Sequence, residues 1–306
     1  DRRQRQMCIR DRRVPLDIWG AILATLGSTA LVLGLTSAGK GASNPVFIVA
    51  MLVGIASLGA FFITQKHTEN GVLPLSLFTR RDRVFTFIAI FLLGAIMTTV
   101  AVFVALYVQT ILKYTTLRAG LAFIPFAFAL ALGAATASKI SMKWAPRWII
   151  LAGCIFMVIG FGWGTAISEE STFWADIFPP TLIIGYGVGL VSIALTLSAV
   201  AGVKPIDVGP LTAISLVAQT LGGPIGLAFA GALAQSYTRH HGGADISVTE
   251  MNSVQLHALG EGYLLTLFVC LGLAVVMGIL SALFIRFTVP DVVEGQKANE
   301  AANDLP

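Results

Sequence analysis

The sequence predicts an all-α membrane protein, a polytopic bundle of transmembrane helices. The chain is 56% hydrophobic and only 12% charged, with a mean hydropathy of +0.83, whereas soluble domains carry about 25% charged residues. Its apolar residues form repeated windows of about 20 residues, the helix length that crosses ~30 Å of hydrocarbon. These windows are too long, and alternate too little, to be the strands of a membrane β-barrel.

Eight apolar windows are long enough to span the bilayer, and clusters of Pro, Gly or charged residues separate them. We expect each window to form one membrane-crossing helix. In chain order the predicted spans are Leu16–Ser37, Pro45–Gln65, Val84–Leu112, Ala119–Ile140, Trp148–Ile167, Ile177–Ala201, Leu211–Ser236 and Gly262–Ile285.

The basic residues of the loops predict the orientation of the spans, because Lys and Arg accumulate in short cytoplasmic loops. If the first span runs outward, ten basic residues after residue 13 lie inside and four lie outside. We therefore expect an integral protein of the plasma (inner) membrane with both ends in the cytoplasm. The inner residues are Lys66, Arg80, Arg81, Arg83, Lys139, Lys143, Arg147, Lys204, Arg286 and Lys297; the outer ones are Lys40, Lys113, Arg118 and Arg239.

Both ends of the chain are polar. The basic segment 1–13 contains the stretch MCIRD, which resembles the translated end of a common sequencing-library adapter, so we interpret this segment as non-native or disordered. We also expect residues 287–306 to be a disordered cytoplasmic tail.

Charged residues are nearly absent from the interior of the predicted spans. A charge at mid-bilayer costs at least ~2.5–3.5 kcal/mol, so a carboxylate held there would be a functional candidate; these spans hold none. The remaining candidates for a substrate path are neutral polar side chains. They are Tyr107, Gln109, Tyr186 and Gln219, of which the two amides each have four hydrogen-bonding sites to satisfy.

Small residues recur at every fourth position of the later spans. In lipid, helices associate through close packing and interhelical hydrogen bonds, and small residues let backbones approach. Pro224 removes a backbone donor and frees the carbonyl of Thr220, which predicts a kink, and Pro125 predicts another. Passive bundle packing would use the same pattern. The residues concerned are Gly160, Gly164, Gly185, Gly189, Gly222, Gly223, Gly226 and Ala230.

The sequence shows no pattern of an enzyme, a metal site or a cofactor site. Its three Cys residues form no CxxC pair, and the His residues of the last outer loop lack the spacing HExxH. Motifs of the types GxSxG, Walker A and Rossmann are absent, and no basic stripe with interleaved aromatics suggests nucleic-acid binding. We therefore expect no enzymatic activity, no metal and no cofactor.

Three stretches in order resemble the major facilitator superfamily, and within it the fourteen-helix drug:proton antiporters of the EmrB/QacA type. They are LPLSLFTRRDRVF (Leu73–Phe85), YVQTILKYTTLRAGLAFIP (Tyr107–Pro125) and GYGVGL followed by DVGPLTAISLVAQTLGGPIGLA (Asp207–Ala228). The resemblance covers about Leu16 to Ile285.

The resemblance implies a division of the chain into parts. Residues 14–66 would be the family's extra central helix pair, 67–83 a cytoplasmic linker and 84–286 the C-terminal six-helix domain. The N-terminal six-helix half would be missing. The cytoplasmic basic loops would hold Arg80, Arg81 and Arg83 and, at a pseudo-repeat of the family's basic loop, Lys139, Lys143 and Arg147; there Ser138 and Met142 replace the usual glycine and aspartate.

The implied function is that of the C-terminal part of a secondary active efflux transporter. It would export small amphipathic molecules or drugs in exchange for protons by alternating access. Its partners would be the lipid bilayer, the substrate, protons and the missing half, which would provide the coupling carboxylates. Two alternatives stay open: an exporter of the same fold for a metabolite, lipid or siderophore, and a non-transporting membrane scaffold fragment without an internal cavity.

Overall fold

The computed structural model describes residues 18–37, 45–67, 80–165, 177–241 and 252–303, and their regular structure is α-helical. The helices are α1 (Ile18–Ser37), α2 (Pro45–His67), α3 (Arg81–Thr110), α4 (Thr116–Ala122), α5 (Ile124–Ile140), α6 (Pro146–Gly164), α7 (Phe178–Ala199), α8 (Pro205–His240), α9 (Ser253–Phe284) and α10 (Val289–Asn303).

The prediction of an all-α membrane bundle is confirmed. Within the described residues, six helical stretches are long and apolar enough to cross a membrane, and they lie on α3, α4–α5, α6, α7, α8 and α9. The two remaining predicted spans lie on α1 and α2, apolar helices of 20 and 23 residues.

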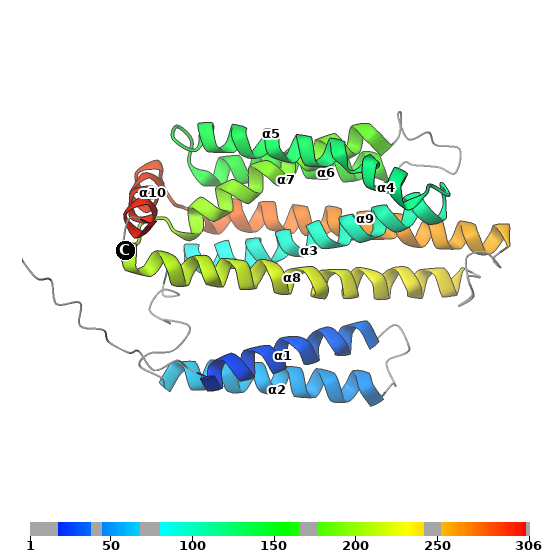
Figure 1. Ribbon diagram of the computed structural model, residues 1–306, viewed down its shortest axis with the longest axis horizontal. Helices are drawn as coiled ribbons and strands as arrows, with labels where there is room; N and C mark the ends of the chain where they lie inside the picture. The colour runs from blue at the N-terminus through cyan, green and yellow to red at the C-terminus, as the bar shows by residue number, and fades with distance from the viewer. Residues whose placement is uncertain (1–17, 38–44, 68–79, 166–176, 242–251, 304–306) are drawn as a thin grey trace, which may run out of the picture.

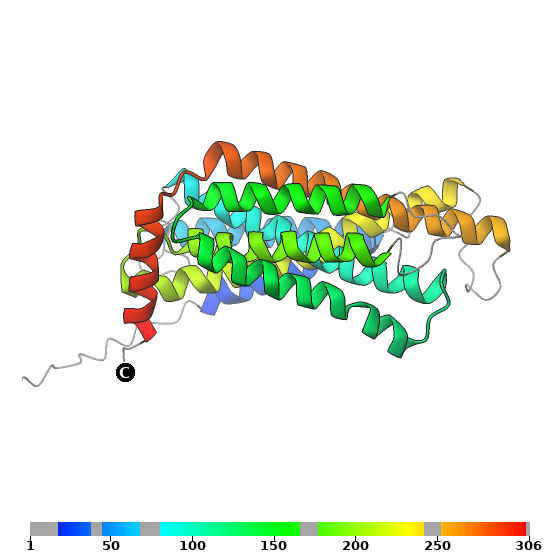
Figure 2. The same cartoon turned by 90° about the horizontal axis from the view of Figure 1, so that it is seen from above.

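The six later spans form one bundle, and α1 and α2 form a separate pair beside it (Figure 1). Helix α7 packs between α5 and α6, while α3 packs on both α8 and α9; α1 contacts the bundle through α8. Seen from above, α6 and α9 lie side by side along one edge of the bundle, and α5 lies along the opposite edge (Figure 2).

The core of the bundle is filled by large apolar side chains from α3, α6, α7 and α9. Leu93, Ile96, Met157, Phe161 and Met277 are each at most 2% exposed. Many equally apolar side chains on the outside are exposed, such as Phe128 at 68% and Ile155 at 58%. In a hydrocarbon solvent such exposure carries no penalty, so these exposed apolar residues fit a surface that faces lipid or another membrane helix.

Basic side chains gather at one end of the bundle. The chain order places the start of α3, the connection α5–α6, the connection α7–α8 and the end of α9 at this end, with α10 lying across it (Figure 1). We call it the basic end; it carries Arg80, Arg81, Arg83, Lys139, Lys143, Arg147, Lys204, Arg286 and Lys297. The end where α3 stops and α4 begins is the opposite end.

Two helices extend well beyond their predicted spans. Helix α8 starts at Pro205 rather than Leu211 and continues through Pro210 and Pro224 to His240. Helix α9 starts at Ser253 rather than Gly262, because Asn252 and Gln255 form a reciprocal capping box. A hydropathy window identifies only the apolar part of a helix, and these extensions contain prolines and polar or charged residues.

Two other expectations need correction. The predicted span Ala119–Ile140 is divided at Phe123 into α4 and α5, with Pro125 in the first turn of α5, where its missing N–H costs little. The tail 287–306, expected to be disordered, contains helix α10, which docks on the bundle with Val292 at 1% and Ala298 at 6% exposure. The segment 1–13 and most of the linker 67–83 lie outside the described residues.

The closest helix crossing supplies a stability test. If Gly222 of α8 carried a Cβ atom, that atom would clash with the carbonyl oxygen of Phe91 on α3. A Cβ atom on Gly209 of the same helix would have no neighbour within 4 Å. We predict that Gly222→Leu lowers the free energy of unfolding in detergent by about 1–3 kcal/mol through overpacking. Gly209→Leu is the matched control and should leave thermal unfolding nearly unchanged. Equal effects of the two substitutions would contradict this account of the crossing.

Candidate functional site

The crossing of α3 and α8 is made by small residues on both helices. A Cβ on Gly94 of α3 would meet the carbonyl oxygen of Gln219, and a Cβ on Gly226 of α8 would meet the Cβ of Ala95. The two backbones are therefore in direct contact. The glycines of TLGGPIGLAFAG create this contact, and Gly94 is the partner that the sequence pattern did not identify.

Gln219 lies at this crossing, about halfway along α8. Its side chain is half-buried, and Nε2 lies 4.0 Å from the sulfur of Met97 as a weak hydrogen bond. Next to it, a Cβ on Gly223 would come 2.5 Å from Oγ1 of Thr98. The amide and a hydroxyl thus place hydrogen-bonding capacity at mid-membrane depth, where a charge would be far more costly.

Tyr107 lies near the opposite end of α3 and lines a small apolar cavity of about 50 Å³. The cavity is lined by residues of α3, α6, α7 and α9, and a ring contact between Phe103 and Tyr263, 5.8 Å between centroids, forms part of its wall. Tyr107 is only 9% exposed. Its ring therefore faces the interior of this domain.

The four substrate-path candidates do not form a single site. Gln109 is exposed near the end of α3, and Tyr186 of α7 packs its ring edge-on against Phe156 of α6, at 5.2 Å between centroids. Gln219 lies at the α3–α8 crossing, separate from both. Several hydroxyls of the spans bond their own helix: those of Thr136, Thr196, Ser198, Ser215 and Thr220 each donate to the carbonyl four residues earlier.

A second close crossing joins α5 and α7. A Cβ on Gly189 of α7 would meet the carbonyl oxygen of Leu130, and a Cβ on Gly185 would come 2.7 Å from that of Phe126. From the other side, a Cβ on Gly133 of α5 would meet the carbonyl oxygen of Tyr186. Helices α6 and α7 also touch, since a Cβ on Gly187 would come 2.6 Å from the carbonyl oxygen of Gly153. The bundle thus contains at least three pairs of helices held at backbone contact: α3–α8, α5–α7 and α6–α7.

At the basic end, Arg83 is buried instead of lying in a solvated loop. It is 4% exposed, and Nη2 donates a hydrogen bond of 3.2 Å to the carbonyl oxygen of Ala201, in the turn between α7 and α8. Arg80 lies nearby, 3.8 Å from the carboxylate of Asp82 and with its guanidinium 5.2 Å from the ring centre of Phe287. These two arginines fasten the start of α3 to the turn and to the chain after α9.

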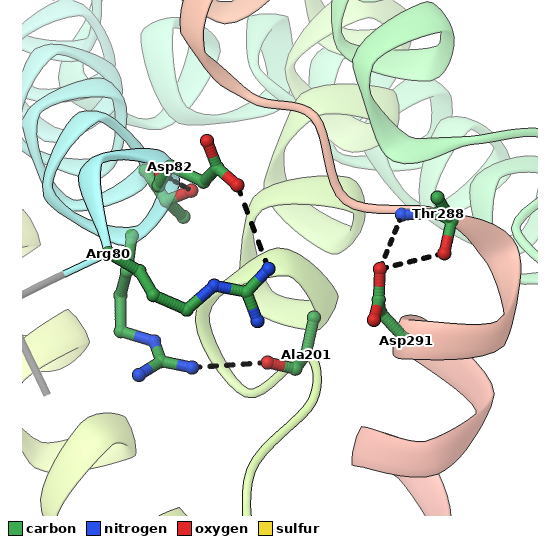
Figure 3. Close-up of polar contacts among 7 residues, drawn as sticks. Arg80, Asp82, Ala201, Thr288 and Asp291 are labelled. Atoms are coloured by element: carbon green, nitrogen blue, oxygen red, sulfur yellow. Dashed lines mark hydrogen bonds and ion pairs between the residues drawn. The ribbon is translucent and has the colours of Figure 1, made fainter.

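Helix α10 closes over the same turn. Oδ2 of Asp291 accepts hydrogen bonds from the backbone N–H of Thr288 at 2.8 Å and from its hydroxyl at 2.7 Å (Figure 3). The carbonyl of Asp291 accepts from the N–H of Gly202 at 3.0 Å. Gly202 has φ of +61°, a conformation that favours glycine, and Gly295 packs against the backbone of Val200 and Ala201.

The Thr288 hydrogen bonds lower the pKa of the Asp291 carboxyl below its ordinary value, the backbone donor first and the hydroxyl second, with a smaller contribution from the charge of Arg80. The charged carboxylate is therefore the form that stabilises the start of α10. Of the other predicted basic-loop residues, Arg81, Lys139 and Lys143 are exposed and Arg147 is partly exposed.

Within the described ranges, no group of three or more His, Cys, Asp or Glu residues is arranged to hold a metal ion. Cys154 and Cys270 are buried free thiols in the bundle. His257 lies 3.4 Å from Glu261 on α9, and Tyr237 of α8 donates to the same carboxylate at 3.1 Å. These contacts join α8 to α9 at the opposite end.

The sequence is similar to curated transporters. It is 38% identical over 291 residues to the "Uncharacterized MFS-type transporter EfpA" of Mycobacterium tuberculosis, covering 94% of this chain and 55% of that protein. It is 31% identical to the "Cephamycin export protein CmcT" of Amycolatopsis lactamdurans and 26% identical to the "Puromycin resistance protein pur8" of Streptomyces alboniger. These matches cover 71% and 72% of this chain and 45% of each relative.

The chain belongs to the major facilitator superfamily. No family profile matches it, so this assignment rests on the relatives and on the fold. A solved bacterial homologue of the human lysosomal transporter Spinster, in an inward-facing and occupied conformation, aligns with a TM-score of 0.57 at 17% identity. The alignment covers 89% of this chain and 66% of that one, and it shows that the fold is shared.

The superfamily consists of transporters and not of enzymes, as the sequence predicts. The chain spans about half the length of the curated relatives that it matches.

The cap of α10 yields a pH prediction. Hydrogen bonds in the folded protein lower the pKa of Asp291, so the charged carboxylate stabilises the docked α10 fully above about pH 5. This stabilisation is lost as the pH falls below ~4, through the lowered pKa of the folded state. We predict that Asp291→Asn at pH 7 weakens the helix start by about 0.3–1 kcal/mol, because it removes a negative charge from the first turn, and that it speeds amide exchange in α10. Glu294→Gln on the exposed side of α10 is the control. Identical exchange in both variants would show that the cap has no such role.

The separate positions of Gln109 and Gln219 yield a labelling prediction. In a full-length protein whose native Cys residues are replaced by Ala, a Cys at exposed position 109 should react readily with a membrane-impermeant maleimide. A Cys at position 219, half-buried against Met97, should react at least about tenfold more slowly unless α8 moves away from α3. Fast, substrate-independent labelling at position 219 would contradict the packing described here.

Proposed function

We propose that the protein containing this chain is a secondary active exporter of small amphipathic molecules or drugs, and that the chain is its C-terminal part. The observation that carries the proposal is the similarity over most of the chain to proteins named for export and resistance, combined with the shared fold. A non-transporting scaffold has no comparable support.

The uneven burial of the spans supports a missing half. In the apolar window of Thr116–Ile140, 17% of the residues are buried, whereas in that of α7 61% are buried inside the bundle. The corresponding windows of α8 and α9 are each 28% buried, and α8 presents exposed Leu216 and Val217. We infer that the N-terminal six helices cover part of these faces, and that α1 and α2 correspond to the extra central pair of a fourteen-helix carrier.

Alternating access gives the close crossings a role. When two halves rock around a midplane site, each half moves as a rigid unit. Backbone contact within the pairs α3–α8 and α5–α7 makes this half stiff, and Gln219 and Gln109 are its candidates for contact with substrate. The predicted kink at Pro224, which lies inside α8, remains part of this proposal.

Proton coupling is assigned to the missing half. Among the described residues, Asp82 and Asp207 lie in the first turns of α3 and α8, and Glu261 lies in the part of α9 that precedes the predicted span Gly262–Ile285. A proton carrier near the midplane therefore has to come from the rest of the protein. We further infer from the charge bias that the basic end faces the cytoplasm.

A second candidate is export of a natural product made by the host cell. The name of the cephamycin export protein favours it, because that relative is named for a metabolite and not for resistance. The two functions share one mechanism and differ in substrate, so a panel of drugs and culture metabolites distinguishes them.

We predict that the full-length gene raises the resistance of an efflux-deficient host to at least one amphipathic drug by several fold, and that residues 1–306 alone raise it to none. The reason is that one half provides only one wall of the central path. Growth inhibition across a drug panel measures this, with expression checked by immunoblot. Resistance from residues 1–306 alone would contradict the proposed division into halves, and metabolite export without resistance would favour the second candidate.

A further inference from the structure

An apolar groove runs between α6 and α9 on the outer surface of the bundle. Its volume is about 300 Å³, and its lining includes Leu151, Ile155 and Ile159 of α6 and Val275, Gly278 and Ile279 of α9. A Cβ on Gly278 would lie 3.3 Å from the Cβ of Cys154, so the two helices approach each other closely at the floor of the groove. Ile155 is 58% and Ile279 is 53% exposed, so the groove faces the lipid.

The basic end of this groove is flanked by cationic and aromatic side chains. Arg147 and Trp148 lie one turn before Leu151 on α6, and Lys143 and Trp144 lie in the preceding connection. Trp144 is 59% and Trp148 is 52% exposed. Exposed Trp rings beside Lys and Arg are typical of the headgroup region of a membrane.

Arg286 follows the end of the other wall. Gly278 and Cys154 are level with each other. Arg147 lies seven residues from Cys154 toward the basic end, about 10 Å along α6, and α9 ends at Phe284, two residues before Arg286. Both arginines therefore lie on the basic-end side of the groove. Arg286 is exposed, as is Lys143.

The donors at this end have capacity for an anion. The guanidinium of Arg147 lies 5.1 Å from the ring centre of Trp148, and its Nε is buried without a hydrogen-bond partner in the described part of the chain. No Asp or Glu occurs between Asp82 and Glu169, so the connection itself supplies no neutralising carboxylate. An apolar groove thus opens onto a cationic mouth.

We propose that the α6–α9 face binds one anionic glycerophospholipid from the leaflet at the basic end. One acyl chain lies in the groove, and the phosphate lies among Lys143, Arg147 and Arg286, with the Trp144 and Trp148 rings at the glycerol level. The cationic mouth selects an anionic over a zwitterionic headgroup. A second copy of the chain is disfavoured as occupant, because in the same membrane orientation it brings its own cationic mouth to the same depth.

This inference rests on the membrane fold and not on the proposed transport function. The site lies on the edge formed by α6 and α9, away from α5 along the opposite edge of the bundle (Figure 2). Its success or failure is therefore separate from the outcome of the resistance assay.

The test is native mass spectrometry of the full chain in detergent with dioleoyl phosphatidylglycerol or dioleoyl phosphatidylcholine as the probe. We expect the unsubstituted protein to retain the phosphatidylglycerol preferentially. The double variant Lys143→Gln/Arg147→Gln should lose this preference, with affinity reduced on the order of tenfold. Lys113→Gln/Arg118→Gln is the matched control, since it removes two exposed charges at the opposite end.

A second variant tests the groove independently of charge. Ile155→Trp places a large side chain in the groove at a lipid-facing position, and it should reduce retention of dioleoyl phosphatidylglycerol with little effect on thermal unfolding. Equal retention of the two lipids by the unsubstituted protein would overturn the proposal. So would equal losses in the two double variants, an unchanged Ile155→Trp protein, or displacement of the lipid by millimolar inorganic phosphate.

Discussion

The fold depends on direct contact between helix backbones. In lipid the hydrophobic effect does not drive helices together, so association requires close packing and short-range polar contacts. At the α3–α8 and α5–α7 crossings glycines lie against carbonyl groups of the facing helix, Gly222 against Phe91 and Gly189 against Leu130. A methyl group in place of either glycine hydrogen would push the helices apart. The positions of the core side chains follow from these contacts.

Composition was enough to predict the helices, because only runs of about 20 apolar residues can cross the bilayer. It was not enough to predict where they end. Asn252 and Gln255 start α9 through a local cap, and α8 continues to His240 with polar residues that hydropathy scores as loop. Likewise α10 contains few apolar residues. It is ordered because Val292 and Ala298 are buried and Gly295 packs against the turn between α7 and α8.

The candidate site was predicted only in part for a similar reason. The glycines of α8 were evident as a pattern, but their partner Gly94 lies in a long apolar span that gives no sign of which helix faces it. Arg83 was counted as one loop charge among several. Its burial and its bond to Ala201 depend on a turn 118 residues later in the chain, and sequence spacing contains no information about that approach. A polar residue at the edge of a span is therefore better treated as a possible anchor than as a topology marker alone.

Helix α3 connects the two kinds of contact. Its first turn is fastened through Arg83 to the α7–α8 turn, which α10 covers from the other side. Its middle lies in backbone contact with α8 through Gly94, and its last turns contribute Tyr107 to the small apolar cavity. Helix α3 also packs on α9 and α7. A movement of α3 at one of these contacts therefore disturbs its other contacts as well. Motion within this domain is thereby opposed, and under the proposed alternating-access mechanism the relative motion falls to the surfaces of α5 and α8 that the bundle leaves exposed.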